Sequence, residues 1–382
     1  MNKYKIYIMV CFMLTSNFAI NAKPDLDERT KSFPVTKGGT LVVSIDPGEI
    51  EITTWDKNEV QILARGIDEE DIDNLQTRIS GNKVTVKYDS RWGWSQNVNL
   101  IISAPKDFNY ELNTSSGSIS FIGRVTGLMD LVTMSGEVKL NDVKGDVYVK
   151  TYGGEIRTGN LNGKIDLSTQ GGEIIVGNII TGPSNIETMG GDIRLRDVGG
   201  DLKMKTYGGD IEIGNIGGNA NVTTYGGDIK VDKVGGDATL DTYGGDIRLR
   251  GATGSIDVST AGGDITLFNI TGRVDAKTSA GDIYVELNPS GKGRSRIETA
   301  MGNIELVIPK ESKVSIEAEI TVQGYGRNRE ENFKINSDFK ETTYDSDRRN
   351  REIFATYEIN GGGEKIYLKT VNSDIDIKKA RK

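Results

Sequence analysis

Carboxylates recur at a fixed place in the middle of the chain. One Asp or Glu directly follows a glycine in nine successive repeats, at Glu137, Glu155, Glu173, Asp192, Asp210, Asp228, Asp246, Asp264 and Asp282. Oxygen ligands in a row suit calcium, which makes Asp210, Asp228, Asp246 and Asp264 candidate metal ligands. The alternative is that each carboxylate accepts hydrogen bonds from backbone amides at a bend. The alternative is favoured, because the calcium roll requires Gly-Gly-x-Gly-x-Asp, whereas Asp here follows Gly-Gly directly. We therefore expect no cofactor, with calcium as the candidate exception.

A second recurring position is aromatic and precedes the same glycines. It holds Tyr152, Tyr207, Tyr225 and Tyr243, the last three in consecutive repeats. Each tyrosine follows a threonine that shares parity with buried residues, so each should point outward. Tyr207, Tyr225 and Tyr243 are therefore candidates for stacking on sugar rings or on a partner's apolar surface. The other interpretation is a self-packing ladder that stiffens the fold, and the two are compatible.

Two tryptophans lie close together outside the repeats. Trp92 and Trp94 occur in Ser90-Arg91-Trp92-Gly93-Trp94-Ser95, a composition typical of a loop tip. They are candidates for gripping a ligand or for packing onto the first repeats. The charged stretch 345–351 is interpreted as a solvated loop.

Several kinds of enzyme site are excluded by composition. The chain has no histidine and a single cysteine, Cys11, which removes histidine general bases and zinc–histidine sites. No phosphate loop or dinucleotide motif stands in a strand–helix context. The repeats from Thr133 to Thr278 carry almost no insertions that could wall a cleft. We expect no enzyme; a carbohydrate-active enzyme using carboxylates is the least favoured alternative.

The elements that must position these residues follow from an 18-residue period. The phrase Thr-Tyr-Gly-Gly-Asp-Ile starts at Thr206, Thr224 and Thr242, and weaker copies extend it both ways. The equivalent threonines are Thr114, Thr133, Thr151, Thr169, Thr188, Thr206, Thr224, Thr242, Thr260, Thr278 and Thr299. Such self-similarity is typical of a solenoid.

The hydrophobic phase changes twice within each repeat. Leu202, Met204 and Thr206 alternate, Gly208-Gly209 breaks the phase, and Ile211 and Ile213 alternate again before a third apolar residue. This pattern predicts an all-β, single-stranded parallel β-helix with 18-residue rungs, right-handed by analogy with parallel crossovers. Rungs about 4.8 Å apart would give a column on the order of 50 Å. The paired glycines are expected to supply positive φ at the corners, and the threonines to hydrogen-bond along the stack.

The period divides the chain into four parts. Residues 1–22 resemble a signal peptide, 23–113 an N-terminal β cap with irregular rungs, 114–309 the regular helix, and 310–382 a charged insertion with a C-terminal capping rung. Strands are expected at 40–45, 49–53, 60–64, 83–88 and 98–103, and a loop or one short helix at 67–79. Caps would cover strand edges that otherwise join end to end.

The N-terminus predicts export. Lys3 and Lys5 precede an apolar stretch, and cleavage after Ala22 fits small-residue processing; an uncleaved anchor is the less favoured alternative, as is lipidation at Cys11. Cleavage would leave no transmembrane segment in the mature chain and would change the net charge from −8 to −10. An acidic protein is a poor partner for nucleic acid or anionic membrane. We expect a location at the cell surface, in the periplasm or outside the cell.

An ordered set of motifs carries a family resemblance. It comprises Phe33-Pro34-Val35 with Gly38-Gly39-Thr40-Leu41, Leu100 to Pro105, the repeated Thr-x-x-Gly-Asp-Ile, and Thr370 to Ile377. Over roughly residues 33–378 the chain resembles the bacterial "putative adhesin" domain of unknown function. The resemblance implies an exported β-helical protein with no established enzyme activity, and it supplies no binding residues. The expected function is adhesive or structural, through binding of protein or glycan by the outer face. The alternative is a periplasmic scaffold that contacts another envelope protein.

Overall fold

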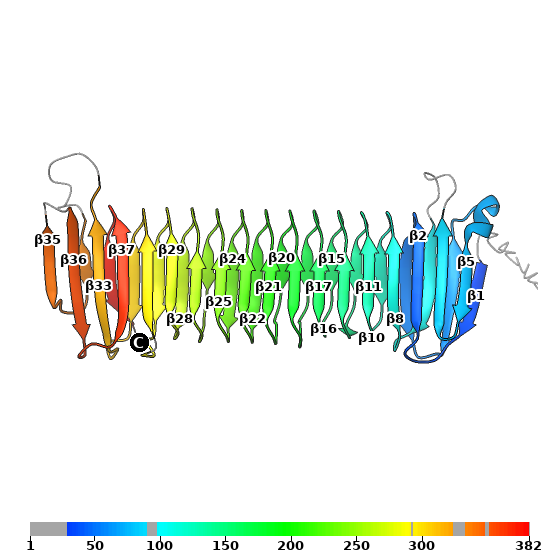
Figure 1. Cartoon of the computed structure of the whole chain (residues 1–382), viewed down its shortest axis with the longest axis horizontal. Helices are drawn as coiled ribbons and strands as arrows, with labels where there is room; N and C mark the ends of the chain where they lie inside the picture. The colour runs from blue at the N-terminus through cyan, green and yellow to red at the C-terminus, as the bar shows by residue number, and fades with distance from the viewer. Residues whose placement is uncertain (1–28, 90–97, 292, 324–332, 348–350, 382) are drawn as a thin grey trace, which may run out of the picture.

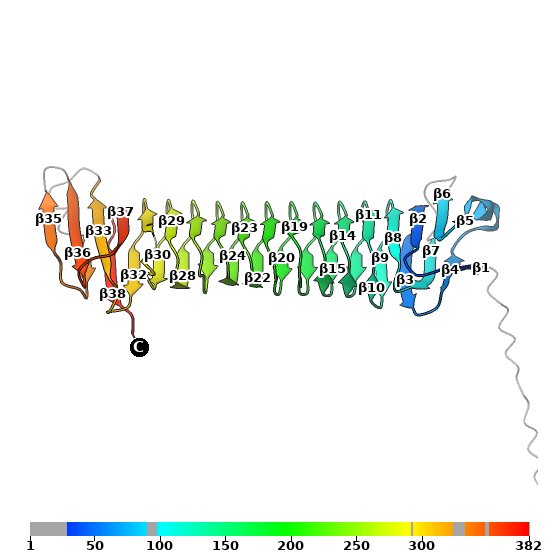
Figure 2. The ribbon, with the colours of Figure 1, turned by 60° about the horizontal axis from the view of Figure 1, so that its bottom comes forward.

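The computed structural model describes residues 29–89, 98–291, 293–323, 333–347 and 351–381. These residues form one straight column of stacked rungs, with strands running across the long axis (Figure 1; Figure 2). The expected all-β parallel solenoid is confirmed. The tryptophans Trp92 and Trp94 and the segment 1–22 lie outside the described residues.

One rung shows how the sequence builds the column. Strand β21 (Leu202–Lys205) ends at the Thr206–Asp210 corner, and β22 (Ile211–Ile216) returns along another face before β23 (Ala220–Thr223) starts the next rung. β21 pairs with β23 in parallel, with Leu202 opposite Ala220, so each residue stacks on its equivalent 18 positions later. The period of the sequence is thus the register of the sheets.

Two long sheets run the length of the column. Sheet A contains the strands that follow the Gly-Gly-Asp corner, and sheet B contains the strands that lead to it. In spatial order sheet A consists of β1 (Arg29–Pro34), β4 (Glu59–Arg65), β7 (Asn99–Pro105), β3 (Glu49–Trp55), β9 (Ile119–Ile122), β12 (Val138–Leu140), β15 (Ile156–Thr158), β18 (Ile174–Val176), β20 (Ile193–Leu195), β22, β24 (Ile229–Val234), β26 (Ile247–Leu249), β28 (Ile265–Ile270), β30 (Ile283–Leu287), β32 (Ile304–Ile308), β38 (Ile375–Lys379) and β34 (Ile335–Ser337).

Sheet B follows the same order through the middle of the column, and the two sheets differ in the number of strands at each end. It consists of β5 (Gln76–Ser80), β6 (Lys83–Asp89), β2 (Thr40–Asp46), β8 (Asn109–Thr114), β11 (Met129–Thr133), β14 (Val147–Lys150), β17 (Ile165–Ser168), β19 (Ser184–Glu187), β21, β23, β25 (Ala238–Asp241), β27 (Ile256–Ser259), β29 (Val274–Thr278), β31 (Arg294–Thr299), β37 (Glu364–Val371), β33 (Val314–Thr321), β36 (Glu352–Ile359) and β35 (Thr343–Asp347). A short third face is made by β10 (Val125–Thr126), β13 (Val143–Lys144) and β16 (Leu161–Asn162) and continues as isolated bridges.

The ends of the column are built from antiparallel strands. At the N-terminal end β1 pairs with β4, β4 with β7, and β5 with β6, all antiparallel. The segment expected as a loop or short helix contains the 3₁₀ helix η1 (Glu69–Asn74), followed at once by β5. At the C-terminal end β36 pairs antiparallel with both β33 and β35.

The first and last parallel rungs of the chain, β2–β3 and β37–β38, lie inside the column and not at its ends. The β2–β3 rung is held between β6–β7 and β8–β9. Likewise the β37–β38 rung sits on β31–β32 and is covered by β33 and β34. The C-terminal rung is therefore not the outermost cap, because the segment expected as a charged insertion supplies the outer layers.

The interior is apolar and continuous, and its longest buried polar feature is a column of threonines. Most inward positions of sheets A and B hold Ile, Leu, Val, Met or Ala; the exceptions include Tyr110, Phe121, Thr158, Ser184 and Ser295. The threonine column is also buried; Thr224 Oγ1 donates to the carbonyl of Gly209 in the preceding rung at 2.9 Å, and the same bond recurs along the stack. The expected hydrogen bonding along the stack is confirmed, with glycine carbonyls as the acceptors.

The corner glycines are required for a reason other than the expected one. Gly208 and Gly209 do not have positive φ. A Cβ added at Gly209 would lie 2.2 Å from the carbonyl oxygen of Gly191 in the rung below, whereas one at Gly208 would keep 3.4 Å from the nearest atom. The expectation of positive φ here was wrong, and close stacking of backbone on backbone selects the second glycine.

Candidate functional site

The outward tyrosines form a ridge at the corner between sheets B and A. We call Tyr207, Tyr225 and Tyr243 the tyrosine ridge. Each follows a buried threonine that anchors the corner, so its side chain is directed away from the core. Their side chains remain 40%, 41% and 62% exposed.

The ridge is a parallel stack. The Tyr207 and Tyr225 ring centroids are 4.9 Å apart and those of Tyr225 and Tyr243 5.1 Å apart, with 4° between planes in both pairs. The predicted self-packing ladder is thereby confirmed. Stacking covers both faces of Tyr225, so this ring offers its edge and hydroxyl group to a partner.

The two ends of the ridge differ. At one end Lys205 Nζ lies 4.3 Å from the Tyr207 ring centroid and donates to the Tyr207 hydroxyl at 2.8 Å. That hydrogen bond is the main cause that raises the Lys205 pKa above its ordinary value. At the other end the next rung carries Ala261 in place of tyrosine, which leaves one face of Tyr243 without an aromatic neighbour.

Tyr152 occupies the same corner position but is not part of the stack. Gln170 and Met189 fill the two rungs between Tyr152 and Tyr207. Tyr152 is 40% exposed and has Lys150 Nζ 5.2 Å from its ring centroid. It therefore resembles Tyr207 in exposure and in its lysine neighbour, and differs in having no ring stacked on it.

The acidic column forms a hydrogen-bonded ladder. Asp228 Oδ1 accepts the backbone amide of Asp246 at 2.9 Å, and the same bond links Asp192 to Asp210, Asp210 to Asp228, Asp246 to Asp264 and Asp264 to Asp282. The amide of Asp246, together with Lys230, holds the Asp228 pKa below its ordinary value. The predicted bonding of carboxylates to corner amides is confirmed for the six aspartates from Asp192 to Asp282. It is not found for Glu137, Glu155 and Glu173, which form ion pairs with Lys139, Arg157 and Arg194.

The hydrogen bonds of the acidic column occupy carboxylate oxygens that calcium would need as ligands. One oxygen of each of Asp210, Asp228, Asp246 and Asp264 already accepts an amide, and Oδ2 of Asp228 contacts Lys230 Nζ at 3.1 Å. In the described part of the chain, no group of three or more His, Cys, Asp or Glu converges as a metal site. Calcium binding by these residues stays a prediction.

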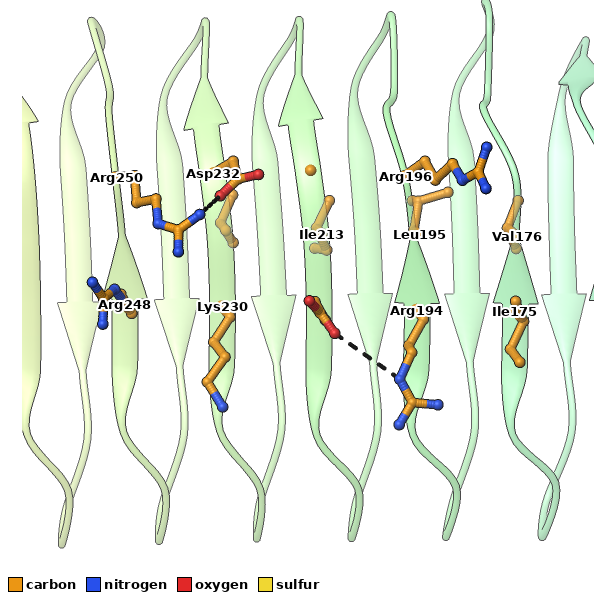
Figure 3. Close-up of a pocket in the computed structure, with 13 residues that line it drawn as sticks. Ile175, Val176, Arg194, Leu195, Arg196, Ile213, Lys230, Asp232, Arg248 and Arg250 are labelled. Carbon is orange, nitrogen blue, oxygen red and sulfur yellow. Dashed lines mark hydrogen bonds and ion pairs between the residues drawn. The ribbon is translucent and has the colours of Figure 1, made fainter.

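Sequence reasoning missed a basic groove on the outer face of sheet A. A hollow of about 410 Å³ crosses the middle rungs, lined by Arg194, Arg196, Lys230, Arg248 and Arg250 among others (Figure 3). Three of these cations occupy the outward position between the two buried residues of β20, β24 and β26. In the sequence this groove is indicated by the repeated Ile-Arg-Leu and Ile-Lys-Val triplets, each of which places a cation on the outer face of its strand.

A family model matches the chain twice, over residues 40–235 and 201–378, and is described as Toastrack DUF4097. The two matches overlap and together span almost all of the described residues. The chain belongs to the Toastrack DUF4097 family. The two matches overlap at residues 201–235, and the 18-residue period continues through this overlap. Both matches therefore lie on one Toastrack column. No curated protein matches the chain.

Solved structures with similarity to this Toastrack chain share little sequence. A "putative adhesin" from Parabacteroides merdae is 12% identical, covering 66% of this chain and 97% of its own, with a TM-score of 0.32. A "putative adhesin" from Bacteroides fragilis is 10% identical (94% and 99% covered, TM-score 0.24), and a "putative lipid binding protein" from Parabacteroides distasonis is 10% identical (94% and 98%, TM-score 0.21). Among the described residues, no helix has the length and apolar character needed to cross a membrane.

Proposed function

We propose that this protein is an exported, non-enzymatic adhesion module that binds a protein or glycan at the cell surface through the tyrosine ridge. The observation that carries the proposal is the pre-stacked, exposed array of Tyr207, Tyr225 and Tyr243 on a rigid corner. Aromatic side chains held in one conformation supply contact area at low entropic cost. The family membership supports a β-helical module and is silent on the ligand.

The ridge offers two kinds of contact. The ring edges and hydroxyls of all three tyrosines form a narrow apolar line with polar tips, suited to a partner that lies along the column. The open face of Tyr243, above the small side chain of Ala261, is the one ring face in the ridge on which a sugar could stack. We expect Tyr243 to contribute most of the binding energy for a glycan.

The described residues favour binding over catalysis. The chain has no histidine, and the carboxylates of the acidic column are held by backbone amides and lie at an exposed corner. A general acid needs burial or a neighbouring charge to raise its pKa, whereas the pKa of Asp228 is lowered. Release of reducing ends from a polysaccharide would overturn this part of the proposal.

The purified protein provides the test. Binding of the wild type to a glycan array and to immobilised matrix proteins is compared with that of the triple variant Tyr207→Ala, Tyr225→Ala, Tyr243→Ala. Tyr152→Ala is the matched control, because Tyr152 has the same corner position and exposure as Tyr207 but lies outside the stack. We expect loss of binding in the triple variant and retention in the control, with unchanged far-ultraviolet circular dichroism in both. Equal binding by all three proteins would refute the assignment of the ridge.

The alternative is a periplasmic scaffold that contacts another envelope protein. Protease shaving of intact cells, with lysed cells as the control, separates the two functions. Cleavage of the repeat region on intact cells supports adhesion. Protection until lysis supports the scaffold.

A further inference from the structure

We propose that the groove on the outer face of sheet A is a second binding site, for a linear acidic polysaccharide that lies along the column. The site is on the outer face of sheet A and uses none of the ridge residues. Its chemistry differs as well, because it is lined by cations and contains no aromatic side chain.

The hollow exists because glycines interrupt one outward column. This column is the position directly after the second buried residue of each sheet A strand. In five successive rungs it holds, in order, Gly177, Arg196, Gly214, Asp232 and Arg250. Gly214 thus has Arg196 on one neighbouring rung and Asp232 on the other, and no side chain of its own. A Cβ at Gly214 would lie 2.2 Å from the carbonyl oxygen of Arg196, so the stacking of the backbone itself keeps this position empty.

The groove lining has more basic than acidic side chains, although the chain as a whole has a net negative charge. Arg194, Arg196, Lys230, Arg248 and Arg250 face two carboxylates, those of Glu212 and Asp232, while the whole chain has a net charge of −8. A concentration of one sign of charge against the sign of the whole protein indicates a surface selected for a ligand of the opposite charge.

Two of the five cations have no carboxylate partner. Among the described residues Arg196 and Arg248 form no ion pair, and Arg248 makes a cation–π contact with Phe268 at 5.2 Å from the ring centroid. Figure 3 shows Arg196 extended across the surface toward the rung of Val176. Both guanidinium groups can therefore donate paired hydrogen bonds to a carboxylate or sulfate.

The other three cations are held in exposed ion pairs. Arg194 contacts Asp192 at 3.0 Å and Glu212 at 4.0 Å, and it also pairs with Glu173. Lys230 contacts Asp228 at 3.1 Å, and Arg250 contacts Asp232 at 2.7 Å, the second of which is drawn in Figure 3. An ion pair this exposed stabilises the folded protein by about 0–1 kcal/mol. An incoming polyanion can compete for these cations at little cost.

The spacing of the cations suits a polymer that runs along the axis. Arg194, Glu212, Lys230 and Arg248 are register partners on four successive rungs. Arg194 and Lys230 are two rungs apart, about 9–10 Å at the ordinary strand separation, which is the length of a disaccharide. A polysaccharide with one acidic group per disaccharide would place successive charges on these rungs.

The surroundings favour a polysaccharide over other polyanions. Single-stranded nucleic acid is bound by stacking of bases on aromatic rings, and the groove lining has none. A membrane or a duplex would also cover the acidic column beside the groove, where Asp192, Asp210 and Asp228 lie at the foot of the same strands. A narrow chain avoids these carboxylates.

The test uses hyaluronan, which carries one carboxylate per disaccharide, and dextran sulfate as probes, with uncharged dextran as the blank. Affinity is measured over a series of salt concentrations for the wild type, for Arg196→Glu with Arg248→Glu, and for the control Lys87→Glu with Lys203→Glu. The control makes the same change in net charge at exposed positions of sheet B. Thermal melting followed by circular dichroism checks that both double variants are folded.

We expect the groove variant to bind roughly tenfold or more weakly, since two charge-assisted contacts are lost, with a shallower dependence on salt. The control should stay within about twofold of the wild type, because exposed charges beyond a Debye length are screened. An equal loss in both double variants, or none in the groove variant, would overturn the site. Tighter binding of poly(U) or of phosphatidylglycerol vesicles than of dextran sulfate would overturn the assignment to a polysaccharide. The ridge triple variant should bind dextran sulfate normally, so failure here is distinguishable from failure of the adhesion proposal.

Discussion

Substitution of the two adjacent corner glycines by alanine should have opposite consequences. A Cβ at position 209 would be 2.2 Å from the Gly191 carbonyl oxygen, 2.4 Å from its carbon and 2.6 Å from the Asp192 nitrogen. All three are backbone atoms of the rung below, so none can rotate away. A Cβ at position 208 would have its nearest neighbour, the Gly190 carbonyl oxygen, at 3.4 Å, an ordinary contact.

The expected cost for Gly209→Ala follows from these distances. Forcing a methyl group into a packed site costs about 1–3 kcal/mol. The same displacement acts on the Gly191 carbonyl, which accepts a hydrogen bond from Thr206 Oγ1 at 2.9 Å, and loss of that bond adds about 1 kcal/mol. We expect a total of about 3 kcal/mol. Gly208→Ala should be neutral or stabilise by up to about 1 kcal/mol, since alanine restricts the unfolded chain.

Urea denaturation followed by circular dichroism measures both changes, and amide hydrogen exchange shows whether the loss is centred on the rungs of Gly191 and Gly209. The difference between the two variants is the informative quantity, because the substitution is chemically the same. Equal destabilisation by both variants would mean that close stacking of carbonyls does not select the second glycine.

Four further predictions concern the acidic column, the threonine column, calcium binding and the tyrosine ridge. Asp228→Ala should cost up to about 1 kcal/mol of unfolding free energy, because the Asp246 amide loses its acceptor at a partly exposed site; Asp228→Asn should cost little, since Asn303 serves in the same ladder. The lowered Asp228 pKa stabilises the fold above its unfolded pKa of about 3.8, and this contribution is lost as pH falls through the folded pKa; Asp228→Asn should therefore flatten the acid limb of a melting-temperature profile. Thr224→Val should cost about 1–3 kcal/mol in urea denaturation, because it leaves the buried Gly209 carbonyl unpaired. Calcium or a chelator should leave the melting temperature unchanged, and a rise with calcium would support the metal prediction. In a glycan-binding titration Tyr243→Ala should weaken affinity more than Tyr225→Ala, whose ring faces are both covered; the reverse order would refute stacking on Tyr243.

Much of the column could be predicted because its information is local and periodic. Alternation of Leu202, Met204 and Thr206, a break at two glycines, and alternation of Ile211 and Ile213 define two strands and a corner in every rung. The outward tyrosines followed from the same parity. Near the N-terminus β2, β3, β4, β6 and β7 were also predicted, because each has its own alternating pattern. β1, β5 and β8 were not predicted, and β5 lies in the segment expected as a loop or short helix.

The order of layers at the ends could not be predicted in this way. Nothing in the pattern of β37 says that it pairs with β31 rather than with β33 alone, since both neighbours present similar apolar faces. The role of Gly209 was missed for a related reason, because the atom that excludes a side chain belongs to another rung. The groove depends on Gly214 standing between Arg196 and Asp232 across adjacent rungs, a relation that appears once the rungs are in register.

Adhesion of whole cells is the most direct test of binding through the tyrosine ridge. Cells lacking the native gene would produce the wild type, the ridge triple variant or Tyr152→Ala at equal levels, and adherent cells would be counted on the ligand identified by the array. We expect the triple variant to lose adhesion and Tyr152→Ala to retain it. Equal adhesion of the triple variant and the wild type would contradict binding through the tyrosine ridge.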